Sequence, residues 1–394
     1  MTAKDLAASE QIAMRDLFGA VNNDLDAPLG PGWERAAWAV PRHRFLPDRI
    51  YLGEELEPCN RAEATETWLR AAYTNDSVVT QINDGEDPGD GERWASSSAS
   101  APSIVFRMLG MLDLAAGHRV LEIGTGTGWN AGLLAHRLGA ENVTTVEVDP
   151  VLATDADMRL RKAGLAPAVV FGDGARGHAS CGPYDRVEAT CSVRSVPRAW
   201  VEQTRPGGIV LTPWETPWLS YGLLRLKVGV QGDASGRFSP HSAFMLMRNQ
   251  RRDLRIYRDV VRDDHQPDEY RTGLSPWAVA GDDWAAQFAM GLQLRDVWWT
   301  WHDNPDVDGV ASRLWVATTD ATSWAAVDRD GKSDDRFTVW QHGPRRLWNE
   351  VEAAHTWWIH AGRPGPERFG LTTAPGTRER VWLDTPDRPV PATG

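Results

Sequence analysis

The chain of 394 residues exceeds a typical single domain, so two domains, or one domain with a large extension, are expected. Its 42% hydrophobic and 24% charged residues are typical of a globular protein, and the formal net charge of −12 argues against a nucleic-acid partner. No stretch approaches the roughly 20 apolar residues that span a membrane, and the amino terminus lacks the apolar core of a signal peptide. The 3 cysteines lack metal-site spacing, so we predict a cytoplasmic protein without a metal or membrane partner.

The first hundred residues are predicted to contain two helical regions and a long polar loop. Residues 5–21 and 33–40 have a helical pattern, whereas the stretch from Tyr51 to Arg93 is polar and resembles a loop. Residues 96–100 read SSSAS, and Pro102 then opens an apolar helix. Because serine-rich runs also form flexible linkers, this run is either a hinge or part of a site.

From His118 onward, strands and helices alternate regularly. Strands are predicted within residues 118–124, 142–149, 166–174, 183–192 and 207–214, and helices over residues 129–139 and 150–164. Strands that are separated by helices of this size imply a parallel, doubly wound sheet. The predicted fold class is therefore α/β.

The pattern changes after Trp214. Residues 223–239 read as a strand, a turn and a second strand, and residues 345–362 read as a helix. The last nine residues are expected to be disordered. Of the 20 tryptophans in the chain, fourteen lie between Trp214 and Trp382. We expect most of them to fill a core and a minority to line a groove.

The stretch VLEIGTGTGWN, residues 120–130, carries the strongest motif. Its glycines, at every second position between a strand and a helix, let the main chain approach a ligand closely. The spacing is not that of a dinucleotide fingerprint, and it suits a small adenosyl ligand. Glu147, which ends the next strand, is expected to accept both ribose hydroxyls. Asp173 and Gly174 follow the third strand and are expected to contact the adenine.

Together these motifs resemble those of the protein-L-isoaspartate O-methyltransferase family, a branch of the class I S-adenosylmethionine-dependent methyltransferases. The resemblance covers about Trp33 to Trp214 and rests on VPRHRFLP, SASAP with its apolar helix, VLEIGTGTGWNAGLLA, FGDG, YDRVEATCS and QTRPGGIVLTP. It implies a Rossmann-like class I fold with an N-terminal helical region and a C-terminal α+β extension. It also implies S-adenosyl-L-methionine as cofactor and S-adenosyl-L-homocysteine as product.

By this resemblance Ser100 matches the family's active-site serine. Ser98 stands where the family usually has threonine, and Ala101 where many members have glutamine, so Ser100 and Ser98 are the predicted catalytic residues. The predicted cofactor-binding residues are Ser97, Ser98, Glu122, Gly124, Thr125, Gly126, Gly128, Asn130, Glu147, Val148, Asp173, Gly174 and Thr190. The serine run is interpreted as the mobile lip of the active site.

We interpret residues 1–95 as the N-terminal helical and loop region of the methyltransferase, residues 96–215 as its Rossmann-like core, and residues 216–394 as a peptide-recognition domain. This extension resembles homologues in lanthipeptide, lasso peptide and graspetide biosynthesis, which methylate an aspartate of a cyclised ribosomal peptide. The ester then leads to a succinimide and, in some systems, to isoaspartate. Repair of isoaspartyl proteins and a non-catalytic peptide-binding module are the alternatives. The partner is thus a modified precursor peptide, and a monomer is the favoured oligomeric state.

Overall fold

The computed structural model describes residues 8–240, 243–305, 307–332 and 335–393. The chain divides into two compact units, and each is described by itself. The first comprises the chain up to Cys191 with residues 197–212 and 227–232; the second comprises residues 192–196 and 213–226 and the chain from Asp233 onward. In the described part of the chain, no helix has the length and apolarity needed to cross a membrane.

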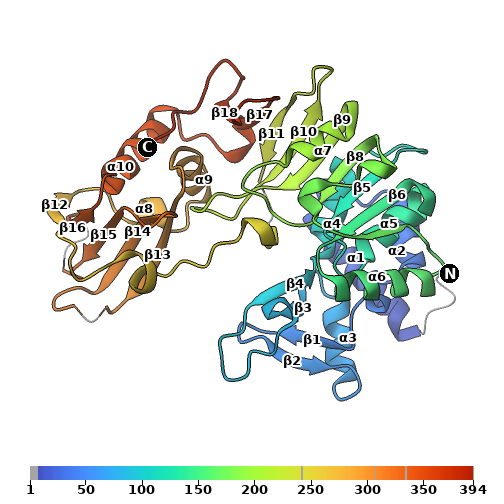
Figure 1. The fold of residues 1–394 in the computed structure, drawn as a ribbon. Coiled ribbons are helices and arrows are strands. Elements are labelled where there is room, and N and C mark those ends of the chain that lie inside the picture. The colour runs from blue at the N-terminus through green and yellow to red at the C-terminus, as the bar shows by residue number, and fades with distance from the viewer. Residues whose placement is uncertain (1–7, 241–242, 306, 333–334, 394) are drawn as a thin grey trace. The chain divides into compact units, whose positions relative to one another are not determined.

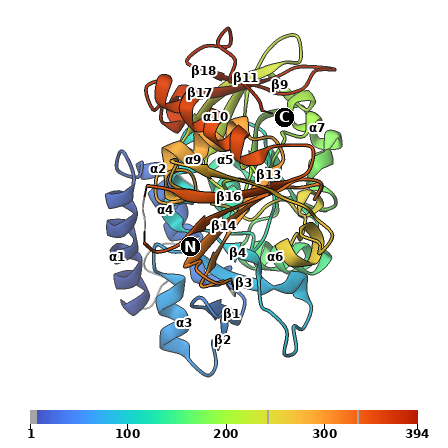
Figure 2. The ribbon, with the colours of Figure 1, turned by 90° about the vertical axis from the view of Figure 1, so that its left-hand side faces the viewer.

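The N-terminal part of the first unit contains a small antiparallel sheet. Helices α1 (Ala8–Asp24) and α2 (Pro31–Ala39) lie close to the predicted helical regions. The sheet has the order β2-β1-β3-β4. Its strands are β1 (Arg49–Leu52), β2 (Glu57–Asn60), β3 (Val78–Ile82) and β4 (Ala95–Ala99). Helix α3 (Thr65–Ala72) packs beside these strands (Figures 1 and 2).

Two predictions for this region are therefore wrong. The stretch from Tyr51 to Arg93 is not a loop, because it includes α3, β2 and β3. These strands have only 4 or 5 residues, which is too short to leave a clear alternation in the sequence. The serine run is not a mobile lip either. It forms β4, with Ser96 and Ser97 buried, and pairs with β3 through Val79↔Ser98 and Val78↔Ala99.

The first unit also holds the predicted parallel sheet, which confirms the doubly wound α/β class. Within this unit the strand order is β9-β8-β5-β6-β7, and the four neighbouring pairs are all parallel. The strands are β5 (Val120–Ile123), β6 (Val143–Glu147), β7 (Ala168–Phe171), β8 (Tyr184–Ala189) and β9 (Thr204–Pro213). The helices are α4 (Pro102–Met111), α5 (Trp129–Leu138), α6 (Pro150–Lys162) and α7 (Arg198–Glu202).

Chain order places the ligand end of this sheet. The path runs from β5 outward through β6 to β7 and then returns to β8 on the other side of β5. In open α/β sheets, ligands bind at the carboxyl ends of the strands where the order reverses in this way. The loops that follow β5, β6 and β8 are therefore the place to look for a site.

The second unit contains two antiparallel arrangements. One has the order β18-β17-β11-β10 and the other, with five strands, the order β12-β16-β15-β14-β13. The strands are β10 (Leu223–Val228), β11 (Ala234–Ser239), β12 (Asp268–Thr272), β13 (Val297–Asp303), β14 (Ser312–Thr318), β15 (Trp324–Arg329), β16 (Phe337–His342), β17 (Phe369–Thr373) and β18 (Arg380–Leu383). The helices are α8 (Trp277–Ala280), α9 (Trp284–Gln293) and α10 (Leu347–His360).

The tryptophans of the second unit divide between core and surface. Those that are buried are Trp214, Trp218, Trp315, Trp324, Trp348, Trp358 and Trp382. Trp277 and Trp284 are 41% and 53% exposed, and the other five are partly buried. The expected core role thus holds for half of the fourteen, and a groove lined by the rest stays a prediction.

Residues 386–393 of the C-terminal tail are ordered, contrary to the sequence-based prediction, and Gly394 lies outside the described residues. Main-chain hydrogen bonds join Val390 N to the Val381 carbonyl and Thr393 N to the Gln293 carbonyl, at 3.0 Å each. These bonds use main-chain groups, which composition does not reveal. The sequence-based prediction of disorder relied on the prolines and glycine of the tail, and composition alone could not show these main-chain bonds.

Candidate active site

The loop between β5 and α5 is built around glycine. Gly124, Gly126 and Gly128 have φ values of 93°, 53° and 86°, which residues with a Cβ rarely adopt. A Cβ on Gly124 would also lie 2.7 Å from Thr190 Oγ1. The loop therefore turns sharply at the carboxyl end of β5 and presents bare main chain.

The serine strand lies against this loop. A Cβ on Gly126 would be 3.9 Å from Ser97 Oγ and 3.9 Å from the Ser98 carbonyl oxygen. Ser97 and Gly126 are distant in the sequence, so the fold brings together the two motifs on which the predicted site depends. Strand β4 is held there by Gln81, which accepts a hydrogen bond from Ser96 Oγ at 2.9 Å and donates one to Asp149 Oδ2 at 2.9 Å.

Glu147 lies at the carboxyl end of β6, where the sequence predicts a ribose-binding carboxylate. Its Oε2 accepts a hydrogen bond from Gly126 N at 2.8 Å, and its Oε1 accepts from Val148 N at 2.9 Å and Asp149 N at 3.1 Å. Each carboxylate oxygen has two acceptor sites, so capacity remains for a ligand hydroxyl. Glu147 thereby fixes the glycine loop and faces the same space.

Two further carboxyl groups lie buried beneath the loop. Glu122 on β5 is aligned with Glu188 on β8, and Asn130 Nδ2 donates to both, at 2.8 Å and 3.0 Å. Thr145 Oγ1 also donates to Glu122. Burial raises the pKa of Glu122 to about 7 and that of Glu188 to about 8. Glu122 and Asn130, predicted to bind the cofactor, thus contact each other in the layer under the loop.

The other predicted cofactor residues follow the strand ends as expected, with different surroundings. Asp173 follows β7 and accepts from Ala175 N at 3.0 Å, and the Gly174 carbonyl accepts from Trp200 Nε1 at 2.8 Å. Thr190 Oγ1 donates to carbonyls at the base of the loop. Thr125 is buried and bonded to Thr145 at 2.6 Å, so its side chain supports the loop from within.

The predicted catalytic serines are both partly accessible. Ser98 lies in β4, and Ser100 follows that strand immediately before α4. Among the described residues neither side-chain hydroxyl has a hydrogen-bond partner. Both hydroxyls are therefore available to a ligand.

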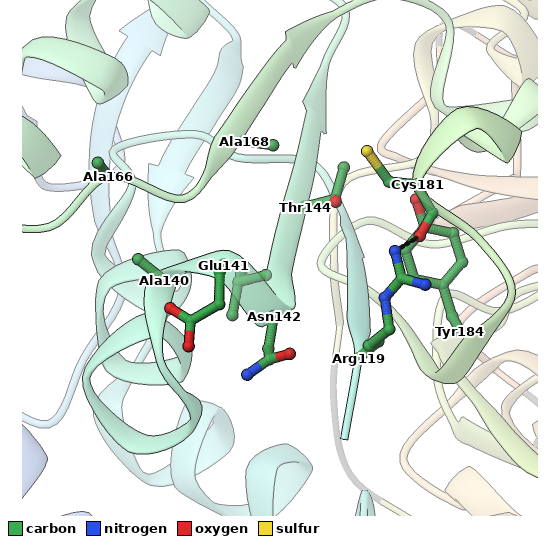
Figure 3. Close-up of a pocket in the computed structure, with 10 residues that line it drawn as sticks. Arg119, Ala140, Glu141, Asn142, Thr144, Ala166, Ala168, Cys181 and Tyr184 are labelled. Atoms are coloured by element: carbon green, nitrogen blue, oxygen red, sulfur yellow. Dashed lines mark hydrogen bonds between the residues drawn. The ribbon is translucent and has the colours of Figure 1, made fainter. Parts of the chain in front are cut away.

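The cavity of about 210 Å³ shown in Figure 3 lies elsewhere. It sits at the amino ends of β6, β7 and β8, opposite the glycine loop, and none of the predicted site residues lines it. Arg119 points toward Cys181 there and donates to its carbonyl oxygen (Figure 3). The Arg119 guanidinium is already hydrogen-bonded to a main-chain carbonyl. Because the cavity also lies at the opposite ends of the strands, we do not assign it to the candidate site.

Comparison with known proteins agrees with this geometry. Residues 43–225 match the sequence model of the family described as protein-L-isoaspartate(D-aspartate) O-methyltransferase. Somewhat less than half of this chain therefore resembles the protein-L-isoaspartate O-methyltransferase family. A family member from Methanosarcina mazei is 34% identical over 181 residues, which are 45% of this chain and 62% of that protein. One from Methanopyrus kandleri is 39% identical over 181 residues, 44% of this chain and 65% of that protein.

The chain thus spans less than two thirds of the length of these protein-L-isoaspartate O-methyltransferases. A solved structure of a protein-L-isoaspartate O-methyltransferase aligns with a TM-score of 0.53 and 20% identity. The alignment covers 94% of this chain and 100% of the chain of that structure. At that identity the likeness concerns the fold, which is that of the class I methyltransferases with an added C-terminal region.

Three residues at the candidate site were not predicted from the sequence. Gln81 lies outside the recognised motifs and Arg42 lies within VPRHRFLP, where no role was predicted for it, and only the fold brings the two residues to β4. Glu188 could have been found, since a carboxylate inside an apolar strand is an anomaly that requires a partner. The roles assigned to the predicted site residues stay predictions.

Proposed function

We propose that this protein is an S-adenosylmethionine-dependent O-methyltransferase that esterifies a carboxylate of a peptide. One observation supports this proposal above all. The serine strand β4 and the glycine loop lie side by side, with Ser97 and Ser98 next to Gly126. An acceptor held by the serines would therefore lie beside a cofactor held by the loop.

The residues at the strand ends fit the cofactor. The glycine loop offers main chain without Cβ atoms, Glu147 Oε2 keeps an acceptor site for a ribose hydroxyl, and Asp173 follows the third strand. The cofactor supplies a methyl group on a positively charged sulfur. The match of residues 43–225 to the protein-L-isoaspartate(D-aspartate) O-methyltransferase model supports the same assignment.

The acceptor needs little activation. A side-chain carboxylate is ionised at neutral pH, so no general base is required. The protein must orient one carboxylate oxygen toward the methyl group, and orientation is where an enzyme gains most in such a transfer. We assign this task to Ser100 and Ser98, whose free hydroxyls donate to the second oxygen without neutralising the first.

The finer proposal is that the acceptor is an aspartate of a cyclised ribosomal peptide. After methylation, the nitrogen of the following residue attacks the ester carbonyl, methanol leaves, and a succinimide remains. The second unit supports this substrate, because its partly exposed tryptophans offer rigid contact area for a constrained ring. Such recognition needs more surface than a methyltransferase domain provides.

Repair of isoaspartyl proteins is the second candidate. The relatives and the solved structure that covers 94% of this chain are named protein-L-isoaspartate O-methyltransferases, and an isoaspartyl group is the substrate that repair would require. A C-terminal region of this size is therefore not confined to enzymes that modify ribosomal peptides, which we call tailoring enzymes. This observation favours repair more than the sequence suggested.

Three matched peptides separate the candidates: a linear isoaspartyl peptide, its linear aspartyl form, and a macrocyclic precursor peptide with an aspartate in its ring. Tailoring predicts methyl-ester formation on the macrocycle, followed by a mass that corresponds to net loss of water. Methylation of the isoaspartyl peptide alone would replace that reading with repair. Failure to bind S-adenosylmethionine by calorimetry would leave only a peptide-binding module.

A further inference from the structure

Arg42 is a buried arginine whose bonds end at the predicted catalytic serine. It lies in the short 3-10 helix Arg42–Arg44 and is 1% exposed. Its guanidinium donates to five main-chain carbonyls. Nη1 reaches those of Ala72 (3.3 Å) and Thr74 (3.1 Å), and Nη2 reaches those of Asp76 (2.9 Å), Ala99 (3.0 Å) and Ser100 (3.1 Å).

The charge of this guanidinium is stabilised by carbonyl dipoles and by the nearby carboxylate of Asp76. Within the described ranges Arg42 forms no ion pair, and the ring of Trp129 lies 5.7 Å from its central carbon. Burial lowers the pKa of Arg42 to about 9, which leaves it charged at neutral pH. An unpaired buried charge is costly. The five carbonyls must therefore be held in place for this arrangement to exist.

The bonds to Ala99 and Ser100 determine the conformation of the serine. The Ala99 carbonyl belongs to the peptide plane before Ser100, and the Ser100 carbonyl to the plane after it. A donor that holds both planes restricts φ and ψ of Ser100, and with them the direction of its Cα–Cβ bond. Ser103 N, bonded to Asn75 Oδ1 at 2.8 Å, secures the following turn.

We propose that Arg42 is a positioning residue that orients the Ser100 hydroxyl toward the acceptor carboxylate. This rests on the proposed function, in which Ser100 contacts that carboxylate. Lysine cannot substitute, because its ammonium is a single point of charge and cannot span two groups of carbonyls. The role is distinct from catalysis, since Arg42 is buried and touches no substrate.

Arg42→Lys tests the proposal against a matched control. Arg186 is also a buried arginine, and its guanidinium donates to the carbonyls of Leu112 and Asp113 at the far end of α4. Both lysine variants should lose stability. Only Arg42→Lys should lower kcat, by about 10- to 100-fold, while the dissociation constant of S-adenosylhomocysteine stays unchanged. Equal kcat losses that follow melting temperature in both variants would contradict the proposal.

A double-mutant cycle with Ser100→Ala measures whether the kcat losses of the two variants are coupled. A merely structural role of Arg42 would produce no such coupling. If Arg42 acts through Ser100, the double variant is no slower than Ser100→Ala alone, because residues that act as a unit are not additive. Additive losses overturn the positioning role. Should Arg42→Lys fail to fold, Arg42→Gln, which keeps one donor group without the charge, is used in the same cycle.

Amide hydrogen exchange tests whether Arg42 holds the segment around Ser100, and it does so without an activity assay. In Arg42→Lys, residues 95–103 should exchange about tenfold faster, as expected for the loss of one net hydrogen bond. Arg186→Lys should change exchange near Leu112 instead. Unchanged exchange over residues 95–103 refutes the inference. If the wild type methylates none of the peptides, the proposed function fails, and this measurement still judges the role of Arg42.

Discussion

Glu122 and Glu188 lie opposite each other on neighbouring parallel strands and share a single side-chain amide as donor, that of Asn130. Both are buried, and both have a pKa raised by burial, to about 7 and about 8. Two carboxylates in such a setting resist simultaneous ionisation. The pair therefore holds a proton near neutral pH, directly beneath the glycine loop.

This pair makes stability depend on pH in a defined direction. Unfolded, both carboxyls ionise near pH 4.5, whereas folded they keep protons up to about pH 7 and 8. The folded state binds more protons in this window, so the free energy of unfolding falls as pH rises from 4.5 to 8. Glu188→Gln should flatten this fall and leave the variant more stable than the wild type at pH 8, on the order of 2 kcal/mol. Urea unfolding at pH 5 and pH 8 checks it, and parallel behaviour of the two proteins would refute it.

Gly126→Ala should block the cofactor at little cost in stability. The new Cβ would meet only Ser97 and Ser98, each at 3.9 Å, and would occupy the space between loop and strand. Gly53→Ala is the matched control, since Gly53 also has a positive φ, 70°, and nothing lies within 4 Å of its Cβ position. Both variants should lose about 1 kcal/mol from backbone strain.

Calorimetry with S-adenosylhomocysteine separates these two variants. Gly126→Ala should bind at least about tenfold more weakly, which corresponds to about 1.4 kcal/mol, and Gly53→Ala should bind like the wild type. Equal affinities would place the cofactor away from Gly126.

Ser100→Ala should lower turnover and spare cofactor affinity. The hydroxyl has no partner within the described part of the chain, so its removal leaves no buried group unsatisfied and the fold should be unaffected. Loss of one orienting hydrogen bond should reduce kcat by about 10- to 100-fold. Steady-state kinetics with the methyl-accepting peptide measures this. A collapse of cofactor binding in its place would assign Ser100 to the adenosyl site.

Trp284→Ala should weaken recognition of a constrained peptide. Trp284 is 53% exposed and packs against Tyr221 with ring centroids 5.3 Å apart and the ring planes tilted by 32°, which gives an aromatic surface in the second unit. Its removal should raise KM for the macrocyclic peptide by about tenfold, the value of one aromatic contact. Val230→Ala, at a residue that is 87% exposed, is the control. If KM is the same in both variants, this surface does not bind the peptide.

The glycine loop and the parallel strands could be predicted because their physics is local. Gly124, Gly126 and Gly128 have positive φ, which favours glycine, and the strand that ends at Ile123 is continuously buried, which favours apolar residues. Both features are therefore visible in the sequence. Glu147 follows from the same logic, since it marks the end of the next strand. The chemistry of the site depends on these few residues.

The strand β4 and the contacts of Arg42 could not be predicted, because they depend on partners that lie far apart in the chain. Strand β4 reads as a linker because serine has little strand preference, and its pairing with Val78 and Val79 keeps it extended. Arg42 bonds to the Ser100 carbonyl, 58 residues away. Neither contact leaves a periodic pattern, so both had to come from the fold.

The central claim is that this protein transfers a methyl group to a peptide carboxylate. The most direct measurement is mass spectrometry of the peptides after incubation with S-adenosylmethionine, with and without mild base before analysis. A carboxyl O-methyltransferase should add one methyl group to an aspartyl or isoaspartyl residue, and base should remove it, as a carboxyl ester requires. A methyl group that survives base, or no transfer to any of the three peptides, would contradict the claim.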